Sequence, residues 1–433
     1  MTGAHRASRP TAPSPAQQAG EQRPDPAPPT SRNRKHRHAR TLTLTPSGSP
    51  AIDWATRSMP LLAASIEQDA PVFAGLHVGI CIHIEPKTAV LCRWLLDQGA
   101  RVTITGNVGT TVPETAEALR TLGVTVIGGR SDDAEQHDRN LDELLAALPD
   151  LVMDNGGELI AKLTRGAPRS STFLGATEET TTGGIAVRAL PQAPDFPVVV
   201  INDSRLKLIV ENEHGVGQSI VQGFMNATNA MVPGARATVV GYGPCGKGVA
   251  DTLRNLGAVV SVVDTDPFRA LEAIMRGHRV GPMEAVLPGT ELLFLATGAR
   301  GVIGSAEIAL LRDGVVIAGV GHEGLELDLE ALLAVTAETT ALSGPGSDPD
   351  ARVLHRLVDG REVVTLSGTR MINLTAAGGN PIQAMDLGLS LQARSLAAIA
   401  RGDVPASEVG PVPVDVDSWL ATSLVAMLGK DGR

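Results

Sequence analysis

ATVVGYGPCGKGVADTLRNLGAVVSVVD, residues 237–264, is the stretch that decides the fold of this chain. The apolar run 237–240 predicts a strand, and a G-x-G-x-x-G turn follows it. The pattern of 249–256 predicts a helix, and a second apolar run at 259–263 ends in Asp264. This order of strand, glycine turn, helix, strand and acid is typical of a dinucleotide-binding unit. The alternative is a glycine-rich loop in another kind of α/β protein.

The glycine turn predicts NAD as the cofactor. Glycines allow a tight turn and let backbone N–H groups approach a pyrophosphate, which the N-terminus of the following helix attracts. An acid about 20 residues further on accepts hydrogen bonds from the adenosine ribose and disfavours the extra phosphate of NADP. We therefore expect the cofactor to contact Gly241, Gly243, Gly246, Lys247 and Asp264.

Composition restricts the class of protein. A chain of 433 residues is long enough for about two domains with sizeable cores. Its net charge of −10 argues against nucleic acid and against an anionic membrane as partners. The three cysteines have neither paired nor metal-ligand spacing, so we expect no metal. The chain has no signal-peptide core and no apolar run of about 18 residues. We expect a cytoplasmic protein.

The first 50 residues differ in composition from the rest. They are rich in Pro, Ser, Thr and Gln, and they carry a basic cluster at 32–38. Such a segment buries too little apolar surface to fold by itself, so we expect a disordered tail. The alternative is an arm that docks on nucleic acid or on a protein partner.

From Ala51 onward, predicted helices alternate with predicted strands, which indicates an α/β fold with two doubly wound parallel sheets. We expect a substrate-binding domain at 51–217, completed by 376–433, and an NAD-binding Rossmann domain at 218–375. Polar residues follow the predicted strands of the first domain, where such folds bind ligands. These residues are His83, Asn107, Asp154, Asn155, Asn202 and Asp203; the predicted helices are 52–67, 88–98, 114–122 and 141–148, and the predicted strands 76–84, 101–105, 124–127 and 151–153.

Further motifs occur in order around the glycine turn. GATEETTTG spans 175–183, and NDSRLK at 202–207 continues to Glu211-Asn212 and to GQS at 217–219. VGH at 320–322 precedes an acidic ELD, His83 precedes TAVL, and DWA at 53–55 opens the regular part of the chain. Together these motifs resemble the S-adenosylhomocysteine hydrolase family, and the resemblance covers about residues 51–425.

The resemblance implies an NAD-dependent reaction on a small-molecule nucleoside. In that family the ribose 3′-hydroxyl is oxidised to a ketone, which acidifies the C4′ proton. Loss of this proton expels the group on C5′, and the hydrolase then adds water and restores the alcohol. Members usually assemble as tetramers, so the resemblance implies a homo-oligomer, either a dimer or a tetramer.

The resemblance also assigns roles to residues. Lys207 matches the lysine beside the 3′-oxygen, which acts as a base, and Glu179 matches the carboxylate that binds the ribose hydroxyls. Glu211 stands where the family has Asp, and His83 matches the histidine near C5′. The remaining matched positions lie around the nicotinamide, the reaction centre or the rest of NAD: Asn212, His322, Thr180, Thr181, Thr182 and Asn373.

Each of these residues also has a structural interpretation. Lys207 alone is compatible with a solvated surface lysine, and Glu178-Glu179 with the first turn of a helix. The run 180–182 is compatible with a β-prone segment. His83 and His322, each at the end of an apolar run, are compatible with structural histidines.

Several positions depart from the family pattern, most of them on the substrate side. Asn155 replaces an acid that serves the active site with the histidine, and an amide accepts no proton at neutral pH. Glu85 and Lys87 replace the Thr and Glu that help to recognise adenine. Asn380 replaces a histidine of a loop near the substrate, and Val216 replaces a cysteine near the nicotinamide. The chain also ends without the tail that reaches a neighbouring subunit's NAD, which leaves the assembly and the tightness of NAD binding open.

The preferred hypothesis is a nucleoside dehydratase that performs 3′-oxidation and elimination at C5′ and then stops. One alternative is hydrolysis of S-adenosylhomocysteine or of S-inosylhomocysteine to nucleoside and homocysteine. A further alternative is a non-enzymatic NAD-binding regulator that docks through its basic N-terminal arm. Retention of Lys207, Glu179, His83 and His322 argues against the regulator.

Overall fold

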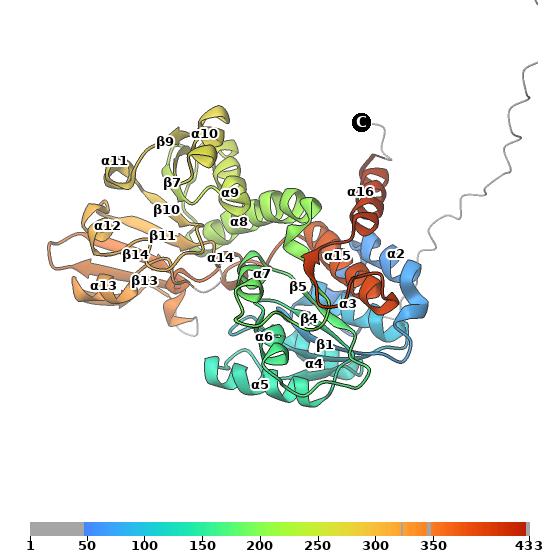
Figure 1. Cartoon of the computed structure of the whole chain (residues 1–433). Helices are drawn as coiled ribbons and strands as arrows, with labels where there is room; N and C mark the ends of the chain where they lie inside the picture. The colour runs from blue at the N-terminus through green and yellow to red at the C-terminus, as the bar shows by residue number, and fades with distance from the viewer. Residues whose placement is uncertain (1–46, 322–323, 344–347, 430–433) are drawn as a thin grey trace, which may run out of the picture. The chain divides into compact units, whose positions relative to one another are not determined.

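Two parallel sheets form the framework of the protein. The structure is a computed structural model that describes residues 47–321, 324–343 and 348–429 (Figure 1). Residues 1–46 of the predicted disordered tail 1–50, with the basic cluster, lie outside these described residues. The predicted boundary is too late, because Pro50 already begins a helix. Among the helices in the described ranges, none is long and apolar enough to cross a membrane.

The first sheet has seven strands in the order β15-β6-β5-β4-β1-β2-β3, and every neighbouring pair is parallel. The C-terminal strand β15 pairs with β6, so the end of the chain completes this sheet. Its strands are β1 (His77–Cys81), β2 (Arg101–Thr105), β3 (Thr125–Ile127), β4 (Leu151–Asp154), β5 (Gly175–Glu178), β6 (Val198–Val200) and β15 (Val409–Pro411), and the helices between them are α3 (Pro86–Asp97), α4 (Pro113–Thr121), α5 (Ala134–Ala146), α6 (Glu158–Thr164) and α7 (Thr181–Arg188).

The second sheet has eight strands in the order β12-β13-β14-β11-β10-β7-β8-β9. Six strands are parallel, whereas β13 pairs antiparallel with both β12 and β14, so the predicted parallel sheet has an antiparallel edge. Its strands are β7 (Arg236–Val240), β8 (Val259–Val263), β9 (Arg279–Val280), β10 (Leu292–Leu295), β11 (Val315–Gly319), β12 (Thr336–Ala341), β13 (Arg352–Leu357) and β14 (Glu362–Leu366), and its helices include α9 (Pro244–Asn255), α10 (Pro267–Met275), α11 (Met283–Val286), α12 (Ser305–Leu310) and α13 (Leu329–Ala334).

In each sheet the strand order reverses beside the first strand. This point lies between β1 and β4 in the first sheet and between β7 and β10 in the second. Ligands of doubly wound folds bind beyond the carboxyl ends of the strands at such a reversal. The glycine turn follows β7, and the loops that carry His83 and Asn155 follow β1 and β4. The predicted fold class is confirmed, and both reversals coincide with predicted site residues.

Aliphatic side chains build the core on both sides of the second sheet. Val239 and Phe294, which point from neighbouring strands, are fully buried together with Val249 and Leu253 of α9. The spacing of four residues places these two on one face of the helix. Burial of a leucine of this kind is worth about 2–3 kcal/mol, so these contacts hold α9 and the glycine turn in place.

The predicted helix 52–67 is wrong as a single element. The structure has α1 (Pro50–Arg57) and α2 (Pro60–Asp69) instead. Proline lacks an N–H and disfavours helical geometry in the residue before it, which explains the break at Met59. Asp386, from the long helix α15 (Ile382–Arg401), accepts hydrogen bonds from the N–H groups of Leu61 (3.0 Å) and Leu62 (2.7 Å). A residue 325 positions away therefore caps α2.

We predict that Asp386→Ala lowers the free energy of unfolding by about 2–4 kcal/mol, because it leaves two buried N–H groups without an acceptor. Urea denaturation followed by circular dichroism measures the change. The control is Asp403→Ala, which removes only an exposed partner of Arg401 and should change stability by about 1 kcal/mol or less. Equal losses in both variants would contradict a capping role for Asp386.

Candidate active site

A π-helical segment carries the predicted catalytic lysine. This segment, η3 (Lys207–Gly215), continues directly into α8 (Val216–Thr228). Lys207 is only 3% exposed. Its Nζ lies 2.7 Å from Oε1 of Glu211 and 3.4 Å from Oε1 of Glu179. The alternative of a solvated surface lysine is therefore wrong, and Lys207 lies between the two predicted ribose-side carboxylates.

The charges of this cluster oppose the effect of burial. Burial disfavours the ammonium of Lys207, but the carboxylates of Glu211 and Glu179 outweigh it and raise the pKa of Lys207 above its ordinary value. Burial also raises the pKa of Glu211; Lys207 opposes this rise and Glu179 adds to it. Two acids thus compete for one cation in a dry environment, and Lys207 rests as an ammonium.

Asn155 contacts the opposite side of Glu179. Its Nδ2 donates to Oε2 of Glu179 at 2.8 Å, and Asn107 donates to the backbone carbonyl of Asn155 at 3.0 Å. The side-chain oxygen of Asn155 is buried and has no hydrogen-bond partner. Asn107 and Asn155, two polar residues predicted to follow strands of the first sheet, are therefore brought together beside Glu179.

Glu178 organises the loop that carries Asn155, and sequence reasoning assigned it no role. It ends β5, so the alternative of a first helical turn at 178–179 is wrong. Its carboxylate accepts the N–H groups of Gly156, Gly157 and Thr180 at 2.8–3.2 Å and also the Thr180 hydroxyl. Burial raises the pKa of Glu178 to about 7, although these hydrogen bonds oppose the rise.

Thr180 begins α7 as its N-cap, with its hydroxyl accepting the N–H of Gly183 at 2.9 Å. The alternative of a β-prone threonine run is therefore wrong. Thr181 accepts a hydrogen bond from Asn202 at 2.7 Å, and Asn202 accepts one from Asn212 at 2.8 Å. Asn212 of η3 is thereby tied to the threonine segment, while Thr182 is exposed.

Asn380 contacts Glu211, whereas Asn155 contacts Glu179 on the other side of Lys207. Its Nδ2 donates to Oε1 of Glu211 at 3.4 Å, and its Oδ1 accepts from Ser219 at 3.0 Å and from Asn373 at 3.2 Å. Ser219 belongs to the GQS motif at 217–219, but no pattern in the sequence indicated this contact. A continuous chain of polar contacts now runs from Asn155 to Asn380.

Glu85 and Lys87 form a buried ion pair, with Lys87 Nζ 2.6 Å from Glu85 Oε2. Lys87 also donates to the carbonyl of Gly378 at 2.6 Å, in the loop that carries Asn380. Burial raises the pKa of Glu85; Lys87 opposes this, and the charges of Glu179 and Glu211 add to it. Glu85 therefore lies within electrostatic reach of the lysine cluster.

The glycine turn has the shape that a pyrophosphate requires. Gly241 has φ of +94°, and a Cβ on Gly246 would lie 1.9 Å from the carbonyl oxygen of Gly241. A Cβ on Gly243 would meet only Arg269, at 3.8 Å, so open space lies at the start of α9. Asp264 accepts the N–H groups of Tyr242 and Asp266. The turn therefore fits NAD.

Close backbone packing connects this turn to the lysine segment. A Cβ on Gly248 of α9 would lie 1.7 Å from the carbonyl oxygen of Glu213, and a Cβ on Gly217 would lie 2.5 Å from that of Gly248. Only glycine permits this approach. Lys247, predicted to contact the cofactor, pairs with Glu272 at 2.6 Å.

The two predicted site histidines differ in whether the structure describes them. His83 is half-buried in the loop between β1 and α3, where the hydroxyl of Thr88 donates to its carbonyl at 2.8 Å. His322 lies outside the described residues. Val216 is buried at the start of α8. Ligand contacts of all these residues stay predictions.

Comparison with known proteins decides the family. A family model described as S-adenosyl-L-homocysteine hydrolase matches residues 37–188, and its NAD binding domain matches residues 212–379. The chain is 38% identical to S-inosyl-L-homocysteine hydrolase of Methanopyrus kandleri, covering 89% of this chain and 92% of that protein. The chain belongs to the S-adenosyl-L-homocysteine hydrolase family. The resemblance seen in the sequence is thus confirmed.

Two further relatives support this membership. Adenosylhomocysteinase of Archaeoglobus fulgidus is 36% identical, over 88% of this chain and 94% of its own length. S-inosyl-L-homocysteine hydrolase of Methanosarcina mazei is 34% identical, over 89% of this chain and 94% of its own length. This member of the S-adenosyl-L-homocysteine hydrolase family is an enzyme, and NAD is its cofactor, as predicted.

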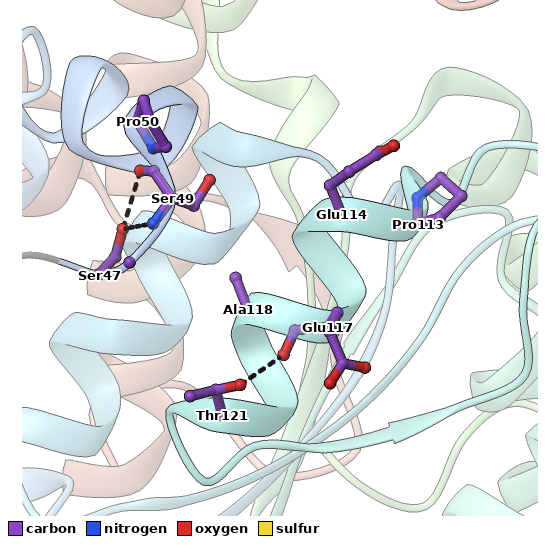
Figure 2. A pocket seen from close by; sticks show the side chains of 9 residues that line it. Ser47, Ser49, Pro50, Pro113, Glu114, Glu117, Ala118 and Thr121 are labelled. Carbon is purple, nitrogen blue, oxygen red and sulfur yellow. Dashed lines mark hydrogen bonds between the residues drawn. The ribbon is translucent and has the colours of Figure 1, made fainter.

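A surface hollow of about 610 Å³ lies elsewhere in this family member, between the start of α1 and α4 (Figure 2). Ser47, Pro50, Glu114, Glu117 and Thr121 are among its lining residues. It contains none of the predicted site residues. The hollow is therefore separate from the candidate active site.

We predict that Gly243→Ala and Gly246→Ala have different effects. Gly243→Ala has room in the fold, so it should leave the melting temperature within about 2 °C but weaken NAD binding at least tenfold, because the methyl group enters the open space at the turn. Gly246→Ala should lower the melting temperature as well, because its methyl group meets backbone. Calorimetric titration with NAD and thermal unfolding test both. Unchanged NAD affinity in Gly243→Ala would contradict the assigned cofactor position.

Proposed function

We propose that this enzyme is a nucleoside dehydratase. It oxidises the 3′-hydroxyl of a nucleoside, removes the C4′ proton and eliminates the C5′ substituent without adding water back. The observation that carries this proposal is the buried Lys207 between Glu179 and Glu211, combined with an amide at Asn155. The lysine and its two carboxylates support oxidation and proton removal. The amide supports an end to the reaction before water is added.

The lysine cluster supplies proton transfer at the sugar. NAD, when bound, supplies the acceptor for the hydride that leaves C3′ and, once reduced, the hydride that restores the 3′-alcohol after elimination. Lys207 takes the proton of the 3′-hydroxyl after it passes its own proton to Glu211, whose Oε1 lies 2.7 Å away. Glu179 holds the ribose hydroxyls. A positioned base of this kind accelerates proton transfer by about 10²–10⁴-fold.

Elimination then needs few further groups. The C3′ ketone acidifies the C4′–H bond. Lys207 passes the 3′-hydroxyl proton to Glu179, 3.4 Å away, and then removes the C4′ proton. The electron pair forms the C4′=C5′ bond while the bond from C5′ to its oxygen substituent breaks. His83 is the residue proposed to protonate the leaving hydroxide, which departs as water.

Asn155 supports an end to the reaction at this stage. Its amide donates to Glu179 and accepts no proton at neutral pH, so it cannot activate a water molecule for addition to C5′. The carboxylate that serves this role with the histidine in the family is absent from the position. Oxidation and elimination retain their residues, whereas water addition loses one.

Hydrolysis of a homocysteine thioether is the second candidate, because the relatives are named as hydrolases of S-inosyl-L-homocysteine or as adenosylhomocysteinases. Of the inosyl and adenosyl thioethers, Lys87 favours S-inosylhomocysteine as the substrate. An ammonium donates to a keto oxygen of a base and does not accept from the amino group of adenine. A non-enzymatic regulator has no such support, because this family member retains the buried lysine cluster.

We further propose that residues 51–217 and 376–433 form the substrate-binding domain and 218–375 the NAD-binding domain. The pairing of β15 with β6 supports this division. A cytoplasmic dimer or tetramer is proposed from the resemblance and the cysteine pattern. Native mass spectrometry tests the assembly.

The first test of function is incubation of the purified enzyme with S-inosylhomocysteine, S-adenosylhomocysteine, adenosine, inosine and a panel of modified nucleosides, followed by mass spectrometry. A nucleoside product lighter by one water supports the dehydratase. Release of homocysteine from a thioether overturns it in favour of the hydrolase.

We predict that Lys207→Met lowers kcat by at least about 10³-fold, because it removes the proton acceptor at the 3′-oxygen. NAD content should stay close to one per chain, measured by absorbance after denaturation. Lys162→Met, which removes a partner of Asp138 and Asp142, serves as the control and should retain kcat. Retention of kcat in Lys207→Met would contradict the assigned role.

We predict that Asn155→Asp shifts the product toward water addition, because it restores a carboxylate in contact with Glu179. The new charge should also slow elimination several-fold, since a third acid joins Glu179 and Glu211. Mass spectrometry in H₂¹⁸O measures the labelled hydrated product. If the ratio of dehydrated to hydrated product equals that of the unmodified enzyme, Asn155 does not determine where the reaction ends.

A further inference from the structure

Gly388 stands at an unfavourable position for glycine. It lies buried inside the 20-residue helix α15, where glycine costs about 1 kcal/mol relative to alanine. Its backbone is helical, so no positive φ requires glycine there. Another constraint must account for the residue.

That constraint is the side chain of Glu211. A Cβ on Gly388 would lie 2.2 Å from Oε2 of Glu211 and 3.2 Å from its Cδ. The first distance is shorter than any van der Waals contact between these atoms. Oε2 of Glu211 is buried and has no hydrogen-bond partner, whereas Oε1 contacts Lys207 and Asn380. One carboxylate oxygen therefore packs on the helix backbone and the other faces the lysine.

The length of Glu211 explains the contact. Glutamate places its carboxylate one methylene further from the backbone than the aspartate of the family pattern. We propose that Gly388 is a positioning residue, whose missing side chain makes room on α15 for the longer Glu211 and so sets Oε1 of Glu211 against Lys207. The catalytic consequence rests on the proposed role of Lys207, but the steric relation does not.

A stability experiment tests the steric relation alone. Gly388→Ala should lower the melting temperature by about 3–8 °C, as overpacking does. In the Glu211→Asp background the same change should leave the melting temperature unchanged or raise it, because alanine favours the helix and the shorter acid avoids the methyl group. In the Glu211→Gln background the loss should persist, because glutamine has the length of glutamate without its charge.

Gly215→Ala is the matched control. Its Cβ would meet the Cβ of Ala384, also on α15, at 2.8 Å and does not involve Glu211. It should lower the melting temperature equally in the wild-type and Glu211→Asp backgrounds. Equal shifts for Gly388→Ala in the wild-type and Glu211→Asp backgrounds would overturn the inference.

Turnover tests the positioning role. Gly388→Ala should lower kcat at least tenfold with little change in KM or in bound NAD, and Gly388→Ala combined with Glu211→Asp should recover most of the kcat of Glu211→Asp. Full kcat in Gly388→Ala would overturn the positioning role. Failure of the proposed function is distinguishable, since it would remove turnover from the unmodified enzyme and leave the melting-temperature coupling intact.

Discussion

The buried contact of Lys207 with Glu179 and Glu211 is the interaction on which the rest of the site depends. A cation without partners is too costly at 3% exposure, so both carboxylates must be held within reach. Each is held from a different part of the chain: Glu179 by Asn155, and Glu211 by Asn380 and the backbone of α15. Asn155, Glu211 and Asn380, which depart from the family pattern, therefore belong to one network of contacts rather than to separate surfaces.

This arrangement explains how the enzyme differs from its family pattern. The glycine turn and its packing on η3 retain the features that NAD requires, whereas Asn155, Glu85, Lys87, Glu211 and Asn380 all depart from the family residues. The contacts show that these departures are neighbours or share neighbours. Under the proposed function, chemistry at C3′ is kept beside a changed environment for the base and for C5′.

Sequence was informative where periodicity or spacing carries the signal. The alternating elements predicted both sheets, and the ordered motifs predicted the lysine cluster. Pro60 marks the helix break at Met59, which the predicted helix 52–67 overlooked. Sequence could not show the π-helical form of η3 or the role of Glu178. These depend on contacts made in three dimensions, such as the cap that Asp386 provides across 325 positions. His322 lies outside the described residues, so its prediction stays open.

The ion pair of Glu85 and Lys87 has a consequence for how this family member diverged. Loss of either residue alone leaves the other as an uncompensated buried charge, which costs about 3–5 kcal/mol. A lineage that changes one position at a time must cross this barrier, so the two sites evolve as a unit. Mutational libraries that vary single positions will therefore not reach stable variants that lack the pair.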